Sequence, residues 1–190
     1  MKRCSWCGTD PVYCEYHDRE WGVAVHNDKK LFEMLILEGA QAGLSWITIL
    51  KRREEYRKAF FDFDVNKLAR LNMPKYQSQK ETLKTKLLED TGIIRNKLKI
   101  ESVFINADVF VSIQEEWGGF SKYLWHFTDG KIIKNTIRNK SEVIVNSVLS
   151  DVISKDLKKR GMKFVGSTIV YAYLQAVGVV DDHEEGCHKN

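Results

Sequence analysis

Apolar residues recur at helical spacing along most of the chain, whereas the strict alternation of a strand is scarce. The first predicted helix begins at Asp28, which we expect to be its N-cap. Its apolar positions are Leu31, Phe32, Leu35 and Ile36. A second helix is predicted over residues 45–60, with an outward-facing basic group formed by Lys51, Arg52 and Arg53. The small residues at 39–44 predict a tight loop between the two helices.

Further helices follow with little interruption, since the chain has only two prolines. They are predicted over Val65–Leu71, Lys80–Glu89, Asn96–Glu115 and Ile169–Val177, with another that is capped by Ser150 or Asp151 and runs to Arg160. The glycine pair at 118–119 interrupts this pattern, and Gly161 is a natural C-terminal stop. The polar segment 76–79 is typical of a surface insertion. With no repeat and no Pro- or Ser-rich linker, the pattern predicts a single all-α domain.

Composition adds only broad limits to this picture. The 190 residues are 43% hydrophobic and 29% charged, which is typical of a soluble globular protein. The first residues lack the apolar stretch of a signal peptide, and no run approaches the roughly 18 apolar residues that span a bilayer. We therefore expect a cytoplasmic protein with no membrane association. A net charge of +4 permits nucleic-acid binding but is weak evidence for it, so the placement of the charges matters more.

Cysteines and histidines gather at the two ends of the chain. Cys4 and His17 near the start match His183 and Cys187 near the end, and together they would complete a closed tetrahedral zinc shell. Such a site would tie together termini that otherwise fray. Rival ligands are Cys7, Cys14 and His188, and Cys4-x2-Cys7 is itself a common zinc half-site. The spacing indicates a metal without assigning its ligands, and unrelated surface residues are the alternative.

The N-terminal third is crowded with aromatic residues around one acidic position. The aromatics are Trp6, Tyr13, Tyr16, Trp21 and Trp46, and Glu38 lies just before the small-residue loop. An enzyme that excises a base must extrude it and then hold it by stacking and edge hydrogen bonds. A carboxylate beside aromatic rings also suits a cationic base. The alternative is ordinary core packing with a solvated glutamate.

The segment 87–97 has the pattern of a helix, a short hairpin and a second helix. Gly92 permits close approach of a phosphate, and the N-terminus of the following helix offers free N–H groups. Arg95, Lys97 and Lys99 add positive charge beside it. The combination suits a DNA backbone bound without sequence reading. An ordinary turn with a solvated basic face is the alternative, as it is for the lysines and arginines of 155–163.

Long segments, taken together, carry a resemblance to a known family. They are RCSW at 3–6, YHDREWGV at 16–23, KKLFEMLILEGAQAGLSWITIL at 29–50, TGIIRNKLKI at 91–100 and LKKRGMKFVGSTIVYAYLQAVGVVDDH at 157–183. In these residues the chain resembles the 3-methyladenine DNA glycosylase I family of the helix-hairpin-helix superfamily. The resemblance covers most of the chain, and segments of this length do not recur by chance.

The resemblance implies roles for particular residues. For one structural zinc ion it implies the ligands Cys4, His17, His183 and Cys187. It implies that Glu38, the catalytic residue, and Tyr16 hydrogen-bond the flipped base while Trp46 stacks on it, with the pocket lined or supported by Tyr13, Trp6 and Trp21. The loop with Gln41, Gly43 and the wedge Leu44 would enter the duplex, and the backbone would be held by Gly92, Ile94, Arg95 and Lys97.

For the whole chain, the resemblance implies one glycosylase unit over residues 1–190. The helix-hairpin-helix would occupy about 80–113, and a zinc-tied terminal subdomain would combine about 1–27 with 165–190. The stretch 72–82 is longer than expected for the family, and 130–147 matches it weakly and receives no role. The aspartate that the wider superfamily uses after its hairpin is missing, because Asp108 is too close to the hairpin and belongs to a helix face.

The implied reaction is hydrolysis of the N-glycosidic bond of 3-methyladenine in double-stranded DNA. That base is cationic while attached, so its bond is already weak and a catalytic aspartate is less necessary. No motif places a lysine to attack the sugar, so we expect a monofunctional, monomeric glycosylase without strand cleavage. A silent module that senses damaged DNA and a zinc-tied interaction protein are the alternatives. The first needs no Glu38 pocket, and the second leaves the basic hairpin without a purpose.

Overall fold

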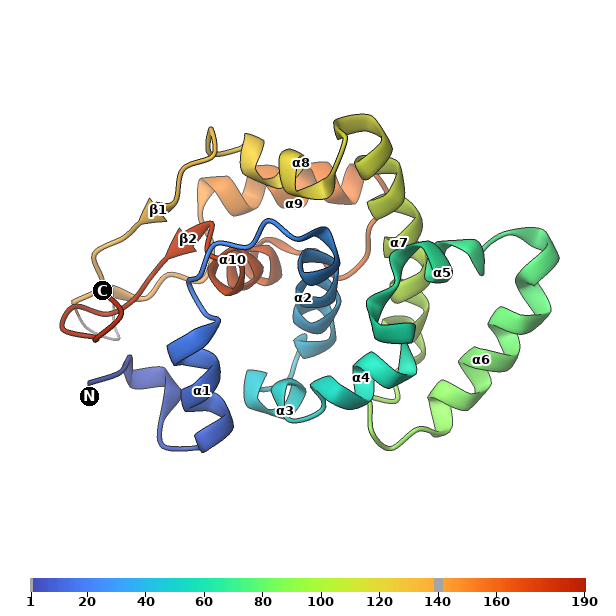
Figure 1. The fold of residues 1–190 in the computed structure, drawn as a ribbon, viewed down its shortest axis with the longest axis horizontal. Coiled ribbons are helices and arrows are strands. Elements are labelled where there is room, and N and C mark those ends of the chain that lie inside the picture. The colour runs from blue at the N-terminus through green and yellow to red at the C-terminus, as the bar shows by residue number, and fades with distance from the viewer. Residues whose placement is uncertain (1, 139–141) are drawn as a thin grey trace.

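The computed structural model describes residues 2–138 and 142–190, and this part of the chain is mostly helical (Figure 1). The α-helices are α1 Pro11–Arg19, α2 Asp28–Gln41, α3 Trp46–Leu50, α4 Arg53–Ala59, α5 Val65–Arg70, α6 Gln77–Glu89, α7 Lys97–Trp117, α8 Phe120–His126, α9 Val148–Lys159 and α10 Ser167–Ala176. Short 3-10 turns are η1 Ser5–Cys7, η2 Phe61–Phe63 and η3 Pro74–Tyr76. None of the helices described is long and apolar enough to cross a membrane.

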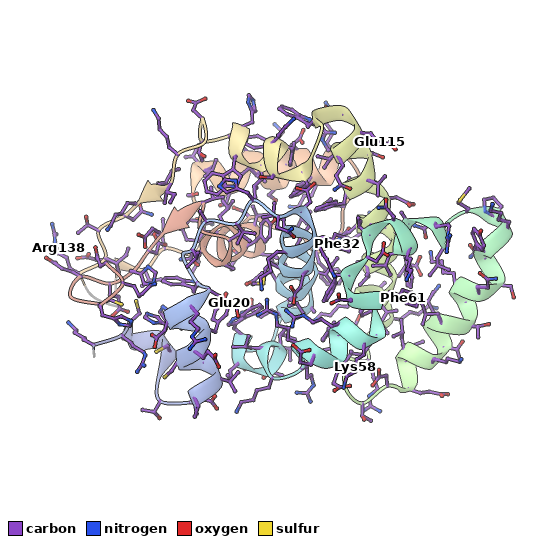
Figure 2. The ribbon with its side chains drawn as sticks, viewed as in Figure 1. Glu20, Phe32, Lys58, Phe61, Glu115 and Arg138 are labelled. Atoms are coloured by element: carbon purple, nitrogen blue, oxygen red, sulfur yellow. The ribbon has the colours of Figure 1, made fainter. Side chains whose placement is uncertain are left out.

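Helix α2 runs through the centre of the molecule, with α10, α3, α7 and α8 packed around it (Figure 1). Every residue from Leu31 to Ala40 is buried, so the helix lies in the core rather than on the surface. Phe32 is fully buried among the central side chains, whereas Lys58 lies at the periphery (Figure 2). A helix enclosed on all sides can keep charged side chains only where something compensates for their burial. The residues that break the apolar pattern of α2 are Glu33 and Glu38, and both are buried.

The segment between α6 and α7 is a short turn that reverses the chain. Asp90 accepts a hydrogen bond from the Gly92 amide at 2.8 Å, and Asn96 caps α7 by accepting from the amides of Leu98 and Lys99. A Cβ on Gly92 would come within 2.8 Å of the Glu55 side chain on α4, so the close approach of α4 requires a glycine there. Helix α6 projects from the body on the side of the molecule opposite the termini (Figure 1).

The two termini lie together, beside a small parallel sheet that the all-α prediction missed (Figure 1). Strand β1 (Ile133–Lys134) pairs with β2 (Val180–Asp181), and the His188 amide donates to the Lys2 carbonyl at 2.9 Å. The segment 130–147, to which the sequence assigned no role, therefore contributes a strand. Residues 139–141 of that segment lie outside the described chain. Two-residue strands are too short to produce the alternation that predicts a strand.

Several predicted boundaries are wrong, each for a local reason. Helix α2 continues to Gln41, so only the second half of the predicted loop at 39–44 is a loop. The predicted helix over 45–60 is broken between Leu50 and Arg53. Arg53 does not face outward: it is only 6% exposed and forms ion pairs with Glu20 and Glu33. Charged side chains of this length are usually solvated, and burial of Arg53 depends on partners distant in sequence.

Other elements begin earlier than predicted or were not predicted. Helix α6 starts at Gln77, so the polar residues at 76–79 belong to a 3-10 turn and a helix rather than an insertion. Asn27 rather than Asp28 caps α2, and Ser147 caps α9. Helices α1 and α8 were missed because each is short and mixed in polarity.

Candidate base-binding cavity and metal-ligand cluster

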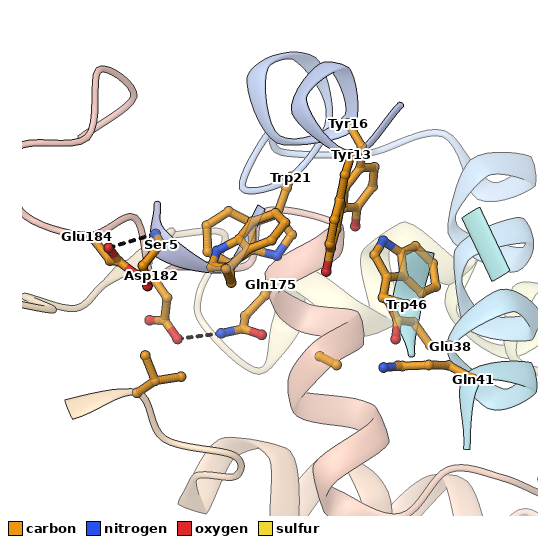
Figure 3. A pocket seen from close by; sticks show the side chains of 13 residues that line it. Ser5, Tyr13, Tyr16, Trp21, Glu38, Gln41, Trp46, Gln175, Asp182 and Glu184 are labelled. Carbon is orange, nitrogen blue, oxygen red and sulfur yellow. Dashed lines mark hydrogen bonds between the residues drawn. The ribbon is translucent and has the colours of Figure 1, made fainter. Parts of the chain in front are cut away.

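Helices α1, α2, α3 and α10, with the turn η1, surround a cavity of about 400 Å³ (Figure 3). The sequence predicted six of its lining residues for a base pocket, namely Trp6, Tyr13, Tyr16, Trp21, Glu38 and Trp46, and it assigned a seventh, Gln41, to the loop that enters the duplex. They come from four separate elements and from the segment after α1, and only the tertiary fold brings them into one enclosure. A mostly apolar cavity of this size with a few convergent polar groups fits a ligand of one aromatic ring system.

Glu38 is the acidic group of this cavity. It lies in the last turns of α2 and is only 4% exposed. No hydrogen bond or ion pair to its carboxyl group is formed within the described part of the chain, and burial raises the pKa of that carboxyl to about 8. The cavity therefore holds a carboxyl group that gives up its proton readily only when a positive charge arrives beside it.

Aromatic side chains form the walls. The Tyr16 and Trp46 rings are 5.5 Å apart, while Trp6 lies 5.0 Å from Tyr13 and 4.9 Å from Trp21, measured between ring centroids. The indole N–H groups of Trp6 and Trp46 are buried and have no partner among the described residues. Burial, reinforced by nearby Glu38, raises the pKa of Tyr16, so its hydroxyl stays protonated and able to donate. The walls thus offer ring faces together with unused donors.

The sequence did not identify the polar residues at the other end of the cavity. Gln175 on α10 donates its side-chain amide to Asp182 at 2.6 Å (Figure 3). Asp182 also accepts from the Tyr171 hydroxyl at 2.6 Å and from Asn135 at 2.7 Å. Since a carboxylate only accepts, the Gln175 amide nitrogen must face it, which leaves the amide oxygen as an acceptor with no hydrogen-bond donor among the described residues. A lone glutamine in an otherwise apolar helix was the sequence signal that could have found it.

The terminal cysteines and histidines form a separate buried cluster. The ligand atoms of Cys4, His17 and Cys187 all lie within 4.8 Å of one another. The Nε2 atom of His17 lies 3.4 Å from the Cys187 sulfur and 3.3 Å from the Cys4 amide. Burial raises the pKa of the Cys4 thiol to about 12, so a thiolate there requires a neighbouring cation.

His183 lies beside this cluster, outside the group of three, and has an unused ring nitrogen. Its ring centroid lies 5.3 Å from that of His17, and its Nε2 atom is buried without a partner. Each of the two rings has its Nδ1 held by a carboxylate, at 2.9 Å by Asp18 for His17 and at 2.7 Å by Asp181 for His183. This carboxylate–histidine pairing typically orients metal ligands, so the residues fit a Cys2His2 ion.

The rival ligands lie differently. The thiols of Cys7 and Cys14 both point at the Gly8 carbonyl, at 3.7 and 3.5 Å. His188 forms a second close group with His17 and Asp18, but its Nδ1 lies 3.0 Å from the Lys2 carbonyl. The geometry favours the cluster that contains both terminal cysteines.

The predicted DNA-contacting residues fall into two exposed places. In the loop after α2, Leu44 is 40% exposed, and Gly43 has φ of +77° with open space where a side chain would be. In the turn before α7, Arg95 and Lys97 are exposed, while Gly92 and Ile94 are half-buried. Lys99, which the sequence grouped with these basic residues, instead reaches the end of α2.

The comparisons with known proteins all identify the same family. Residues 6–190 match the family model described as methyladenine glycosylase. The DNA-3-methyladenine glycosylase 1 of Escherichia coli (strain K12) is 44% identical over 98% of this chain and 96% of its own length.

Two solved structures resemble the whole chain. A crystal structure of 3-methyladenine DNA glycosylase I is 43% identical with a TM-score of 0.90, covering 98% of each chain. The Staphylococcus aureus enzyme, solved to explain its recognition of 3-methyladenine, is 36% identical with a TM-score of 0.90, covering 99% of this chain and 96% of its own.

Proposed function

The chain belongs to the methyladenine glycosylase family, and from that membership and the geometry of the cavity we infer that it excises 3-methyladenine from DNA. It is a DNA repair glycosylase that hydrolyses the bond between base and sugar. The observation that carries the conclusion is the buried Glu38 carboxyl, which lies in an aromatic cavity where no described residue supplies a counter-charge.

The charge of the substrate explains why such a site is useful. An adenine methylated at N3 is cationic while it is attached to the sugar, whereas ordinary adenine is neutral. Only the cationic base compensates for the burial of an ionised Glu38, so binding itself discriminates damage from undamaged DNA. We assign Tyr16 to a hydrogen bond on the edge of the extruded base and Trp46 to its face, because both contact the cavity beside Glu38.

Cleavage of the bond to this cationic base needs little further catalysis. As the bond from C1′ to the base breaks, its electron pair neutralises the positive charge of the base. Water adds to C1′, and its second proton goes to solvent. Glu38 would stabilise the positive charge that develops on the sugar. None of the described residues that line the cavity is a lysine, so no amine is placed to attack C1′, and the proposal is base removal without strand cleavage.

For metal binding we propose one zinc ion held by Cys4, His17, His183 and Cys187. Four protein ligands leave no position for water, so the ion would act structurally and join the chain ends. The Cys187→Ser variant should lose bound metal, as measured by elemental analysis, and unfold at a lower temperature than the parent. The matched control Cys14→Ser should retain one ion per chain. Equal metal content in both variants would contradict the ligand assignment.

DNA contacts are assigned to the two exposed places. We propose that α6, the turn 90–96 and α7 form a helix-hairpin-helix that binds the phosphate backbone through Gly92, Ile94, Arg95 and Lys97. The loop with Gln41, Gly43 and the wedge Leu44 would fill the gap that the extruded base leaves. All these parts come from one chain, so the proposed active form is a monomer acting as one unit over 1–190.

The decisive experiment is base release from methylated duplex DNA, resolved by chromatography. The parent should release 3-methyladenine, and Glu38→Gln and Trp46→Ala should each lower the single-turnover rate by about 100-fold or more, since charge and stacking are both lost. Enzyme–DNA adducts should not form in the presence of borohydride. A folded parent that binds methylated DNA and releases no base would instead be a damage-sensing module.

A further inference from the structure

Lys99 differs from the basic residues beside it. Arg95 and Lys97 are exposed to solvent, whereas Lys99 is half-buried and its ammonium points back into the protein. It donates to the carbonyl oxygen of Ala40 at 2.8 Å and to that of Ala42 at 2.7 Å. Burial lowers the pKa of this lysine, in keeping with an ammonium withdrawn from water. The Lys99 ammonium therefore already donates to backbone carbonyls and does not point toward solvent, where a phosphate would bind.

The carbonyls that Lys99 binds belong to the end of α2. Ala40 lies in its last turn, and Ala42 is its C-cap and begins the exposed turn toward Leu44. Carbonyls at a helix C-terminus lack intrahelical partners and carry partial negative charge, so a cation there is stabilising. Within the described chain, Lys99 is the one side chain that hydrogen-bonds to the backbone of residues 40–44.

The hairpin and the end of α2 also pack against each other. Ile93, Ile94 and Ile100 face Ile36 and Ala40 across a gap of only about 10 Å³. The Ile94 amide donates to the Tyr56 hydroxyl at 3.2 Å, which fixes the turn on the same core. The turn assigned to DNA contact and the end of α2 that leads into the Leu44 loop are thus parts of one packed unit, and Lys99 is the polar link between them.

We propose that Lys99 is a positioning residue that couples docking of the hairpin on the DNA backbone to insertion of the 41–44 loop. The proposal rests on the DNA contacts assigned above. Opening a duplex costs free energy, and an inserted side chain can drive that opening only if the backbone that carries it is held rigidly. Lys99 does not line the cavity, so it acts on the duplex step and not on recognition of the free base.

Three measurements on Lys99→Met separate this role from the alternatives. Its single-turnover release of 3-methyladenine from duplex DNA at saturating enzyme should fall about tenfold. Its affinity for free 3-methyladenine, followed by tryptophan fluorescence, should stay within twofold of the parent. The slope of log affinity against log salt on undamaged duplex should not change, because no phosphate contact is lost. Lys99→Arg keeps a cation and its donors, and should recover at least half of the rate.

Two further variants serve as controls. Lys97→Met should reduce the salt slope by about one, as expected for a lost phosphate contact. Lys155→Met, on the exposed face of α9, should match the parent in all three measurements. A Lys99→Met variant that resembles Lys97→Met would make Lys99 a phosphate ligand and overturn the proposal.

Other outcomes are equally clear. If Lys99→Met released 3-methyladenine from duplex DNA as fast as the parent, the loop would not depend on the Lys99 contact, and the proposal would be overturned. Loss of free-base affinity together with the duplex rate would show a general structural role, and this too would overturn the proposal. If the parent released no base, the proposed function itself would be contradicted, independently of the role of Lys99.

Discussion

Helix α2 carries two buried glutamates, five residues apart, in opposite electrostatic situations. Glu33 is 5% exposed and Glu38 is 4% exposed, so burial does not distinguish them. Glu33 accepts from Arg53 at 2.7 Å and from Arg57 at 2.9 Å, and the Lys30 ammonium lies 3.7 Å away. Among the described residues no such partner reaches Glu38, and burial raises the pKa of its carboxyl to about 8.

The comparison shows what marks the binding site. A buried carboxylate with resident counter-charges is part of the scaffold, since its charge is satisfied before any ligand arrives. A buried carboxyl group without one is costly to ionise, and that cost is recovered only when a cationic ligand supplies the missing charge. The N-terminal half of α2 therefore holds α4 and the C-cap of α1 in place through Arg53, and we propose that its C-terminal end selects a charge on the base.

Removal of the counter-charge at Glu33 should have the largest effect on stability. Arg53→Met leaves the buried Glu33 and the half-buried Glu20 without their shared partner, so we expect the free energy of unfolding to fall by about 3–5 kcal/mol. Urea denaturation at pH 7 measures this. Arg57→Met, in which a more exposed partner is lost, should cost about 1 kcal/mol or less. If Arg53→Met cost no more than Arg57→Met, the two ends of α2 would not differ as described.

Glu38→Gln should raise the free energy of unfolding above acidic pH, whereas Arg53→Met lowers it. The folded carboxyl keeps its proton up to a pKa of about 8, whereas the unfolded carboxyl releases it near 4.5. Between these values the folded state binds more protons, so the Glu38 contribution to stability is lost as pH rises. Over that window the parent should lose on the order of 3 kcal/mol relative to the variant. Parallel loss of stability in both proteins, measured by urea denaturation from pH 5 to 8, would contradict the prediction.

The same titration of Glu38 should appear in ligand affinity. For a permanently cationic 3,9-dialkylated adenine, the affinity of the parent should rise about tenfold per pH unit below 8 and level off above it. The reason is that only the ionised Glu38 offers a counter-charge. In Glu38→Gln the affinity should be weak and independent of pH. Fluorescence titration between pH 5.5 and 9 measures both, and a flat profile in the parent would show that Glu38 is already ionised when empty.

Much of the cavity could be anticipated because its residues are chemically unusual where they stand. Tyr16, Glu38 and Trp46 belong to long segments that resemble the family, and a carboxylate beside several aromatics has few ordinary explanations. The two terminal pairs of cysteine and histidine were likewise visible, although only the structure shows that His17 and His183 are each held by a carboxylate. Gln175 and Asp182 stayed hidden, since their orientation depends on partners in other segments.

Two basic residues show most clearly what the sequence could not predict. In the sequence, Arg53 and Lys99 are charged residues in basic runs, which usually face solvent. In the structure Arg53 is buried between two glutamates and Lys99 is bound to the end of α2. Neither position follows from spacing, because each partner comes from another helix. The local pattern predicts which face of a helix is apolar. It does not predict which distant group will contact a charged residue that departs from that pattern.

The sequence by itself therefore determined the helical character, the family, and the residue types available for recognition and for a metal. These depend on local periodicity and on long matching segments, which are properties of the chain alone. Only the tertiary structure decided which carboxylate of α2 keeps a counter-charge and which does not. That difference arises because α1 and α4 bring Glu20, Arg53 and Arg57 to one end of the helix, while aromatic rings enclose the other.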